Sequence, residues 1–321
     1  MSKRVVLAWI AGALVSAPAL TLAQGAPGSC DRECLKGFVN AYVGAMVAHD
    51  PGKAQLASNF VLVENLKRIG TSAGLWSAAS GPPKEFQIYV PDTRAQQIGY
   101  MAVLEANGKP VQLALRLKVD NRKVVEAEQL VIYTVGERAL PNLQKPRKAF
   151  GVPVPEPYRD SRGRLLYMGA SYYEALDNNN GSLAPFADDC VRNENGTPTS
   201  RNATPDDPSA IMGSVGLGCA AQLDTQRFSY ITTIGNRRVW IADEETGQVF
   251  GLSQFHHSSE QKVFEMVGIP GLESRTLDKP PYDKPFDMAA AHLFKIWGGK
   301  IHEIEAIGFA APYNAPSGWE K

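Results

Sequence analysis

The chain has 321 residues, of which 44% are hydrophobic and 21% are charged, which is the composition of an ordinary globular protein. Its 33 Lys and Arg residues equal its 33 Asp and Glu residues in number, and no segment holds a block of basic residues. Nucleic-acid-binding proteins and proteins held on anionic membranes normally carry such a block, so both classes are disfavoured. The length is sufficient for two domains of ordinary size.

The first 23 residues have the pattern of a signal peptide. Lys3 and Arg4 give a positive start, an apolar stretch follows from Val5 to Leu14, and small residues end at Ala23. A membrane-spanning helix is the alternative, but Pro18 interrupts the apolar stretch. We therefore predict a secreted or periplasmic protein that is cleaved after Ala23 and has no membrane segment thereafter.

Four cysteines in an exported protein favour two disulfides over metal or redox sites. Proximity in the sequence favours the pairs Cys30–Cys34 and Cys190–Cys219, although three pairings are possible. The first bridge would hold the start of the mature chain. The second would close a loop that is rich in Gly, Pro, Asn and Asp and has little core of its own.

Two parts of the chain repeat one another in three blocks. Over the first block, at a shift of 130 residues and without a gap, Glu64 aligns with Glu194 and Asn65 with Asn195. Two later blocks align at shifts of 151 and 177 residues, so the second copy carries two insertions. Matching polar residues at matching spacings, in the same order, indicate an internal duplication. The aligned segments are Tyr42–Met46 with Tyr172–Leu176, Tyr89–Asp92 with Trp240–Asp243, Leu117–Val119 with Phe294–Ile296, and Lys123–Glu128 with Lys300–Glu305.

Each copy is predicted to begin with a helix and to continue as a sheet. In the first copy, apolar residues recur every three or four positions from Leu35 to Val47, as they do on one face of a helix. Turn residues then separate segments of alternating polar and apolar residues. This order places each copy in the α+β class, with a strongly curved antiparallel sheet around its helices. The predicted strands are Asn59–Glu64, Phe86–Val90, Ile98–Leu104, Val111–Val119 and Val124–Ile132.

Glu126 and Glu128 are the carboxylates of the last hairpin, and they align with Glu303 and Glu305. A three-residue turn at 120–122 would place Arg116 opposite Glu126 on a solvent-facing side, where ion pairs contribute little. A two-residue turn would move the glutamates to the apolar face, because a slip of one residue exchanges the faces. We favour the solvent-facing arrangement, and the sequence leaves the register open.

Helices packed on a curved sheet that ends in a Lys-Val/Ile-x-Glu-x-Glu hairpin resemble the NTF2-like, or SnoaL-like, cone. The resemblance covers Leu35–Tyr133 and Tyr167–Pro312 and implies a pocket between the helices and the concave sheet. After the predicted signal peptide over 1–23, we expect a first cone over 24–140, a linker over 141–166, a second cone with two insertions over 167–312 and a tail over 313–321. Cones commonly pair through their sheets, so the two copies would form an internal pseudo-dimer and leave the chain monomeric.

Several short motifs are also similar to those of a secreted bacterial and fungal family of unknown function. At Leu66 and Lys67 the chain departs from that pattern, because a Gly normally follows the Glu-Asn pair. No catalytic residue carries over from this resemblance. The motifs are Cys30-Asp-Arg-Glu-Cys34-Leu35, Gly74-Leu75-Trp76, Arg192-x-Glu194-Asn195-Gly196 and Pro312-Tyr313-x-x-x-Ser317-Gly318-Trp319.

Familiar catalytic signatures are missing from the sequence. It has no Gly-x-Ser-x-Gly elbow, no Walker loop and no His-Glu-x-x-His pair. The histidine spacing is unlike known zinc sets, and the glycines at 213–218 do not match a dinucleotide fingerprint. We therefore expect neither a metal nor a cofactor, no nucleic-acid partner, and a small organic molecule as the ligand.

Histidines distinguish the two copies, since four of the five lie in the second. His292 replaces Leu115 in the alignment, so it is expected on the inward, apolar face. With a three-residue turn, His302 lies diagonally across from it on that face. Two inward imidazoles would suit proton transfer, and a pair of satisfied core histidines is the alternative. His256 and His257 end a strand where exposed histidines are common, and His256 is a candidate pocket residue.

Glu194 and Asn195 end the first strand of the second copy, near the expected mouth of its pocket. Arg192 is the expected partner of Glu194, although capping of the next turn would also explain the repeated pair. Tyr172 and Tyr230 lie on segments that would line the same cavity, where aromatic residues are more often plain core.

Two functions follow from these residues. The first is an exported small-molecule-binding protein that also acts as a cofactor-independent lyase, isomerase or hydrolase. In that case His292 or His302 would be the base, and Glu194 and Arg192 would orient the substrate or stabilise charge. The second is a non-catalytic ligand-binding or interaction protein that uses the paired cones.

Overall fold

The computed structural model describes residues 28–200, 217–269 and 271–320 of the chain. The predicted signal peptide, residues 1–23, lies outside them. Within the described ranges, no helix has the length and apolar character needed to cross a membrane.

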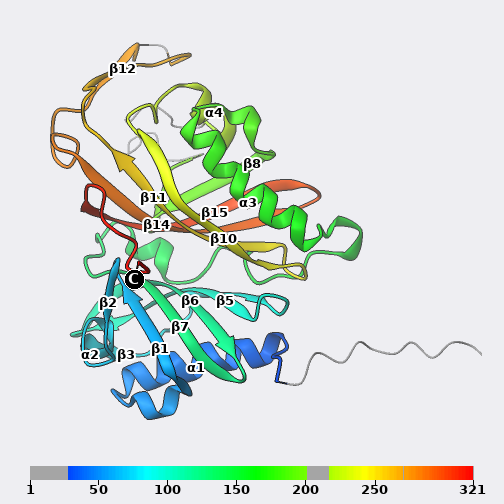
Figure 1. The fold of residues 1–321 in the computed structure, drawn as a ribbon. Helices are drawn as coiled ribbons and strands as arrows, with labels where there is room; N and C mark the ends of the chain where they lie inside the picture. The colour runs from blue at the N-terminus through cyan, green and yellow to red at the C-terminus, as the bar shows by residue number, and fades with distance from the viewer. Residues whose placement is uncertain (1–27, 201–216, 270, 321) are drawn as a thin grey trace, which may run out of the picture.

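The first half of the chain forms one long helix, one short helix and a seven-stranded sheet (Figure 1). The sheet has the order β2-β1-β7-β6-β5-β3, with β4 paired to β5, and only the β1–β7 pair is parallel. The elements are α1 (Arg32–Val47), a 3-10 turn (Pro51–Ala54), β1 (Leu56–Glu64), β2 (Lys67–Ile69), α2 (Leu75–Ala78), β3 (Ala79–Gly81), β4 (Gln87–Asp92), β5 (Gln97–Ala106), β6 (Lys109–Asp120) and β7 (Lys123–Ile132).

The second half repeats this order around a six-stranded sheet, β10-β11-β14-β15-β8-β9, in which only β8 and β15 are parallel. Short 3-10 turns (Leu140–Leu143 and Glu156–Tyr158) lie between the halves. The elements are α3 (Arg162–Asp177), a 3-10 turn (Gly181–Leu183), β8 (Phe186–Glu194), β9 (Thr197–Pro198), α4 (Cys219–Asp224), β10 (Thr233–Asp243), β11 (Gln248–His257), β12 (Val263–Glu265), β13 (Ser274–Thr276), β14 (Phe286–Trp297) and β15 (Lys300–Pro312). Strands β12 and β13 form a separate two-stranded arm. The predicted α+β class is confirmed.

The strand registers of the two halves correspond residue by residue. Glu64 of β1 faces Gln129 of β7, and Glu194 of β8 faces Ala306 of β15. On the opposite edges of β7 and β15, Gln129 pairs with Leu115 of β6, and Ala306 pairs with His292 of β14. Positions 177 residues apart in these hairpins are therefore structurally equivalent.

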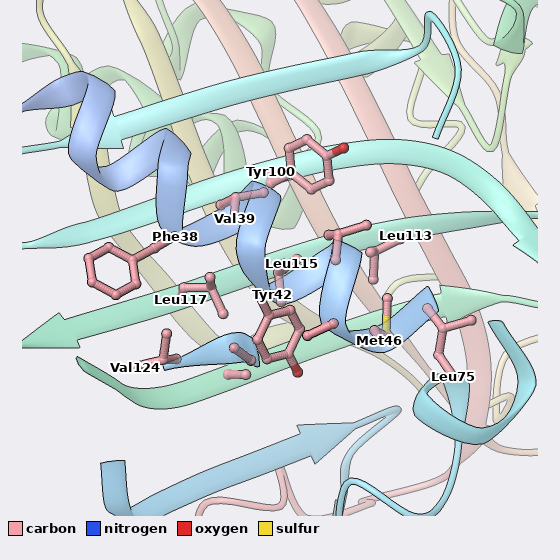
Figure 2. Packing of buried hydrophobic residues seen from close by; sticks show 14 of the residues in the cluster. Phe38, Val39, Tyr42, Met46, Leu75, Tyr100, Leu113, Leu115, Leu117 and Val124 are labelled. Atoms are coloured by element: carbon pink, nitrogen blue, oxygen red, sulfur yellow. The ribbon is translucent and has the colours of Figure 1, made fainter. Parts of the chain in front are cut away.

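Helix α1 is held on the concave face of its sheet by a continuous apolar stripe. Asp31 caps its start by accepting a hydrogen bond from the Cys34 amide at 2.8 Å. Phe38, Tyr42 and Met46 are buried against alternate residues of β6 (Figure 2). At roughly 2 kcal/mol for each large buried apolar side chain, this packing, rather than helix propensity, determines where the helix lies.

The outer faces of the two sheets pack against each other, with α1 and α3 on the outside of the pair (Figure 1). Arg116 and Glu128 are 3% and 1% exposed at this interface. Arg238 of the second half binds both carboxylate oxygens of Glu128, at 2.5 and 2.6 Å, and Trp319 of the tail lies 5.0 Å from Arg116. We expected the sheet face that carries Arg116 and Glu128 to be exposed to solvent, and this expectation was wrong. Ion pairs with the other half allow these alternating polar side chains to be buried between the two sheets.

The hairpin register also differs from the favoured one. Asp120 pairs with Lys123, so the turn has two residues, and both take the left-handed conformation of a type I′ turn. A bulge beside Lys118 then returns Glu126 and Glu128 to the face away from α1. As a result, Arg116 lies opposite Glu128 instead of Glu126. The predicted register was wrong, but the glutamates do lie on the face away from α1.

In the second half, Glu303 and Glu305 also face outward, where Arg147 covers them. Arg147 lies 3.2 Å from Glu303 and 3.1 Å from Glu305, and it also donates to the Ile304 carbonyl at 2.6 Å. Burial raises the pKa of Glu305 to about 7, although Arg147 opposes the shift.

Both predicted disulfides are present. Cys30–Cys34 joins the start of the described chain to the first turn of α1, and Cys190–Cys219 joins β8 to α4. In β8 the second bridge lies two residues before Arg192.

Candidate functional site

A cavity of about 270 Å³ lies between α3 and the concave face of the second sheet. Its walls come from α3, β8, β11, β14, β15 and the segments around residues 228–231 and 281–286. Most of the lining side chains are apolar or aromatic, and a few are polar. The polar or ionisable ones are Tyr172, Arg192, Glu194, Asn195, Tyr230, His257, Tyr282 and His292.

The equivalent space in the first half is filled by its own side chains. The indole of Trp76 donates to the Tyr42 hydroxyl at 2.9 Å, and that hydroxyl donates to Gln129 at 2.8 Å. Gln129 in turn donates to Glu64 at 2.8 Å. In the second half Ala306 occupies the position of Gln129, so Glu194 has no such amide partner and the space stays open.

Arg192 and Glu194 form the charged end of the cavity. Strand alternation directs both inward, and the Arg192 Nε lies 3.0 Å from a Glu194 oxygen. Arg192 also donates to Thr199 at 2.9 Å and to Gln222 at 2.8 Å, and its guanidinium lies 5.0 Å from the Phe228 ring. The Arg192 side chain is 2% exposed and that of Glu194 is 41% exposed, so the cation is fixed and the carboxylate is accessible.

His292 lies on the inward face of β14, as its alignment with Leu115 predicted. It pairs with Ala306 of β15, which in turn pairs with Glu194 of β8. Its Nδ1 lies 3.1 Å from the Tyr173 hydroxyl, and its ring lies 5.2 Å from the ring of Tyr172. Burial, and then the charge of Arg192, lower the pKa of His292 to about 3. The imidazole is therefore neutral, and it is better suited to hydrogen bonding than to general-base catalysis, which works best with a pKa near the working pH.

An aromatic wall faces this polar end. His257 stacks on Phe286 at 4.2 Å between ring centroids and on Tyr230 at 5.6 Å. Burial lowers the pKa of His257 to about 4, so it is also neutral at physiological pH. Tyr282 packs edge-on against Tyr230 at 5.1 Å and completes the wall.

Two of the histidines proposed for the site lie outside the cavity. His256 points to the other face of β11 and its Nδ1 lies 2.8 Å from Asp287, because neighbouring residues of a strand alternate between faces. Phe255 and His257 are the residues of that strand that line the cavity. The period-two pattern that begins at Phe255 could have identified His257 from the sequence.

His302 is turned outward by a bulge. Ile296 pairs with Ile301 and Lys295 with Glu303, which leaves His302 as the extra residue of β15. Its ring stacks on Trp297 at 3.4 Å, and its Nδ1 lies 2.7 Å from Asp189. The three-residue turn that would have brought His302 beside His292 is replaced by a two-residue turn, so the expected inward pair does not form.

Asn195 lines the cavity, but its side chain is fully used by the backbone. Its oxygen accepts from the Gly308 amide and its nitrogen donates to the Gly308 carbonyl, both at 2.9 Å. Asn65 makes the same pair of bonds with Val131 in the first half. The structure thus brings together His292, Arg192, Glu194, Tyr172 and Tyr230, and it gives Asn195 the turn-fixing role that the repeat suggested.

No group of three or more His, Cys, Asp or Glu side chains in the described ranges is arranged to hold a metal ion.

Residues 158–308 match the model of a domain of unknown function, DUF8021. No curated protein matches the chain. Solved structures that resemble part of it include a putative polyketide cyclase from Xanthomonas campestris pv. campestris, with 16% identity, 46% of this chain and 90% of that chain covered, and a TM-score of 0.27. A putative isomerase from Bacillus subtilis has 10% identity, coverage of 31% and 87%, and a TM-score of 0.26. AusH from Aspergillus nidulans has 12% identity, coverage of 32% and 87%, and a TM-score of 0.27. These values are too low to transfer an activity.

Proposed function

We propose that the chain is an exported pair of NTF2-like cones, in which the second cone binds a small, flat, mainly apolar organic molecule. The observation that carries this proposal is the open cavity of the second half at the position where the first half is filled by Trp76 and Gln129. Apolar walls with a few convergent polar groups are typical of small-molecule sites. The two disulfides fit an oxidising compartment outside the cytoplasm.

The division into cones follows the same proposal. Residues 24–140 would form the first cone, 141–166 the linker, 167–312 the second cone and 313–321 the tail. Helix α3 begins at Arg162, five residues before the proposed start of the second cone. The two cones would act as an internal pseudo-dimer, because their sheets already cover each other.

Cofactor-independent acid–base catalysis is a second candidate function. It is favoured by one observation, namely that an accessible carboxylate, Glu194, shares the cavity with a buried imidazole, His292. In this case Glu194 would transfer the proton, Arg192 would stabilise developing charge, and neutral His292 would hydrogen bond the substrate. The low pKa of His292 argues against this residue as the base.

The binding proposal can be tested with N-phenyl-1-naphthylamine, an uncharged aromatic probe whose fluorescence rises in apolar sites. We expect the wild type to bind one probe per chain and Ala306→Gln, which restores the first half's glutamine, to abolish binding. Ala48→Gln makes the same chemical change at an exposed position and should bind like the wild type. Thermal unfolding of each variant establishes that it is folded. Absence of saturable binding to the wild type, or unchanged binding in Ala306→Gln, would overturn the proposal.

A further inference from the structure

We infer that the ligand of the second half is a flat organic anion, of the aromatic carboxylate, sulfonate or phenolate class, with its charged oxygen beside Arg192 and His292. This inference rests on the proposed function and specifies the chemical class of the ligand. It follows from the positive charges around the cavity and from the neutral donors beside them.

The first argument is the imbalance between Arg192 and Glu194. The guanidinium is almost completely buried, so its charge acts through protein rather than through water. The carboxylate is 41% exposed, so solvent screens it more strongly. Among the cavity-lining residues that the structure describes, Glu194 is the one acidic side chain.

The second argument is that two more guanidinium groups lie behind the aromatic wall. Arg227 lies 5.3 Å from the ring of Phe228, the same ring that Arg192 approaches at 5.0 Å. Arg275 lies 4.8 Å from the ring of Tyr230. Both rings line the cavity, so Arg227 and Arg275 lie next to lining side chains, whereas Arg192 lines the cavity itself.

These cations are close enough to repel one another. Burial lowers the pKa of Arg227 to about 10. Tyr230 and Glu194 oppose this shift, and the charges of Arg275 and Arg192 add to it. Such a gathering of like charges costs folding free energy, and it is typical of sites that receive an opposite charge.

The third argument is that the uncharged polar groups beside Arg192 can donate hydrogen bonds. Burial raises the pKa of Tyr172 to about 12, so its phenol keeps its proton. His292 is neutral and keeps one N–H, which its ring can present to a ligand or to Tyr173. A buried cation with neutral donors is the arrangement that stabilises an anionic oxygen.

The test compares N-phenyl-1-naphthylamine with 8-anilinonaphthalene-1-sulfonate, which has the same skeleton and adds one sulfonate. For wild type at low ionic strength, we expect the sulfonate to lower the dissociation constant by on the order of tenfold, and added salt to reduce this advantage. Arg227→Gln and Arg275→Gln should each weaken sulfonate binding about threefold or more, with the uncharged probe unaffected. These variants avoid the buried hydrogen-bond network of Arg192, whose replacement could prevent folding.

Arg164→Gln is the matched control, because it removes one charge from an exposed position of the same half. It should leave the affinities of both probes unchanged. Equal affinities of the wild type for both probes, or sulfonate binding that is insensitive to Arg227→Gln and Arg275→Gln, would overturn the inference. If the wild type does not bind the uncharged probe at all, the proposed function itself is overturned. The two failures are therefore distinguishable.

Discussion

The two halves of this protein have the same strand order and register but opposite interiors. In the first half, the space between helix and sheet is closed by hydrogen bonds from Trp76 through Tyr42 and Gln129 to Glu64. In the second half, Ala306 replaces Gln129, and the space is a cavity lined by His292 and Arg192. Ala306 in place of Gln129 is one of the differences that separate a filled core from a cavity, together with the indole of Trp76 in the first half.

The largest effect is expected from opening the first half. Trp76 is 1% exposed and packs edge-on against Tyr42 at 5.1 Å. We expect Trp76→Ala to lower the free energy of unfolding by about 3–5 kcal/mol, because it leaves a cavity and removes a hydrogen bond.

Chemical denaturation measures this change. Trp240→Ala is the comparison, since Trp240 is 46% exposed, and its loss should be within about 1 kcal/mol. A loss of similar size in both variants would show that Trp76 does not close the first half.

The second effect concerns the carboxylates at equivalent positions on the outer faces. Glu128 is held by Arg116 and Arg238, whereas Glu305 is held by Arg147 and has its pKa raised to about 7. A carboxyl whose pKa is higher in the folded state stabilises the fold below its unfolded pKa. This stabilisation is lost as the pH rises through 7.

Relative to Glu305→Gln, the wild type should therefore lose up to about 3 kcal/mol of stability between pH 4.5 and pH 8, at 1.36 kcal/mol per pKa unit. Denaturation of both proteins at the two pH values gives the difference. A gap that does not change with pH would show that Glu305 has an ordinary pKa.

Exchanging the residues at the Leu115 and His292 positions sharpens the comparison further. Leu115→His would bury an imidazole where the partner of His292, Tyr173, is replaced by Val43, so we expect a loss of about 2 kcal/mol. Thermal and chemical unfolding test this value. An unchanged stability would show that the first half has room for polar groups in its core.

The smallest effect is expected from His292→Leu, which gives the second half the residue of the first. Stability should change by less than about 1 kcal/mol, because Leu suits the aromatic surroundings. Binding of 8-anilinonaphthalene-1-sulfonate should weaken several-fold, because a donor to the anion is lost. Unchanged binding would remove His292 from the site.

Much of the fold could be predicted because it depends on patterns local to the chain. Alternation and helical spacing indicated α1 and the strands, and the pairing of neighbouring cysteines indicated both disulfides. Internal alignment placed His292 on the inward face, because equivalent residues of a repeat share a face. Arg192 and Glu194 were found in the same way, from their place at the end of a repeated strand.

Other features depend on contacts that the chain does not display locally. One bulge turned His302 outward and another kept Glu126 and Glu128 on the face away from α1, and a bulge adds one residue without changing the polar pattern around it. The outer face of each sheet has the same alternating pattern of polar residues in the sequence whether that face contacts water or is buried by ion pairs with the other half. By itself, the sequence determined the repeated α+β units and the inward imidazole. Only the tertiary structure decided that the outer faces of the sheets are buried. It also decided that the second half has a cavity beside Ala306, whereas Gln129 helps to fill the equivalent space of the first half. Both features depend on contacts between residues that are far apart in the sequence.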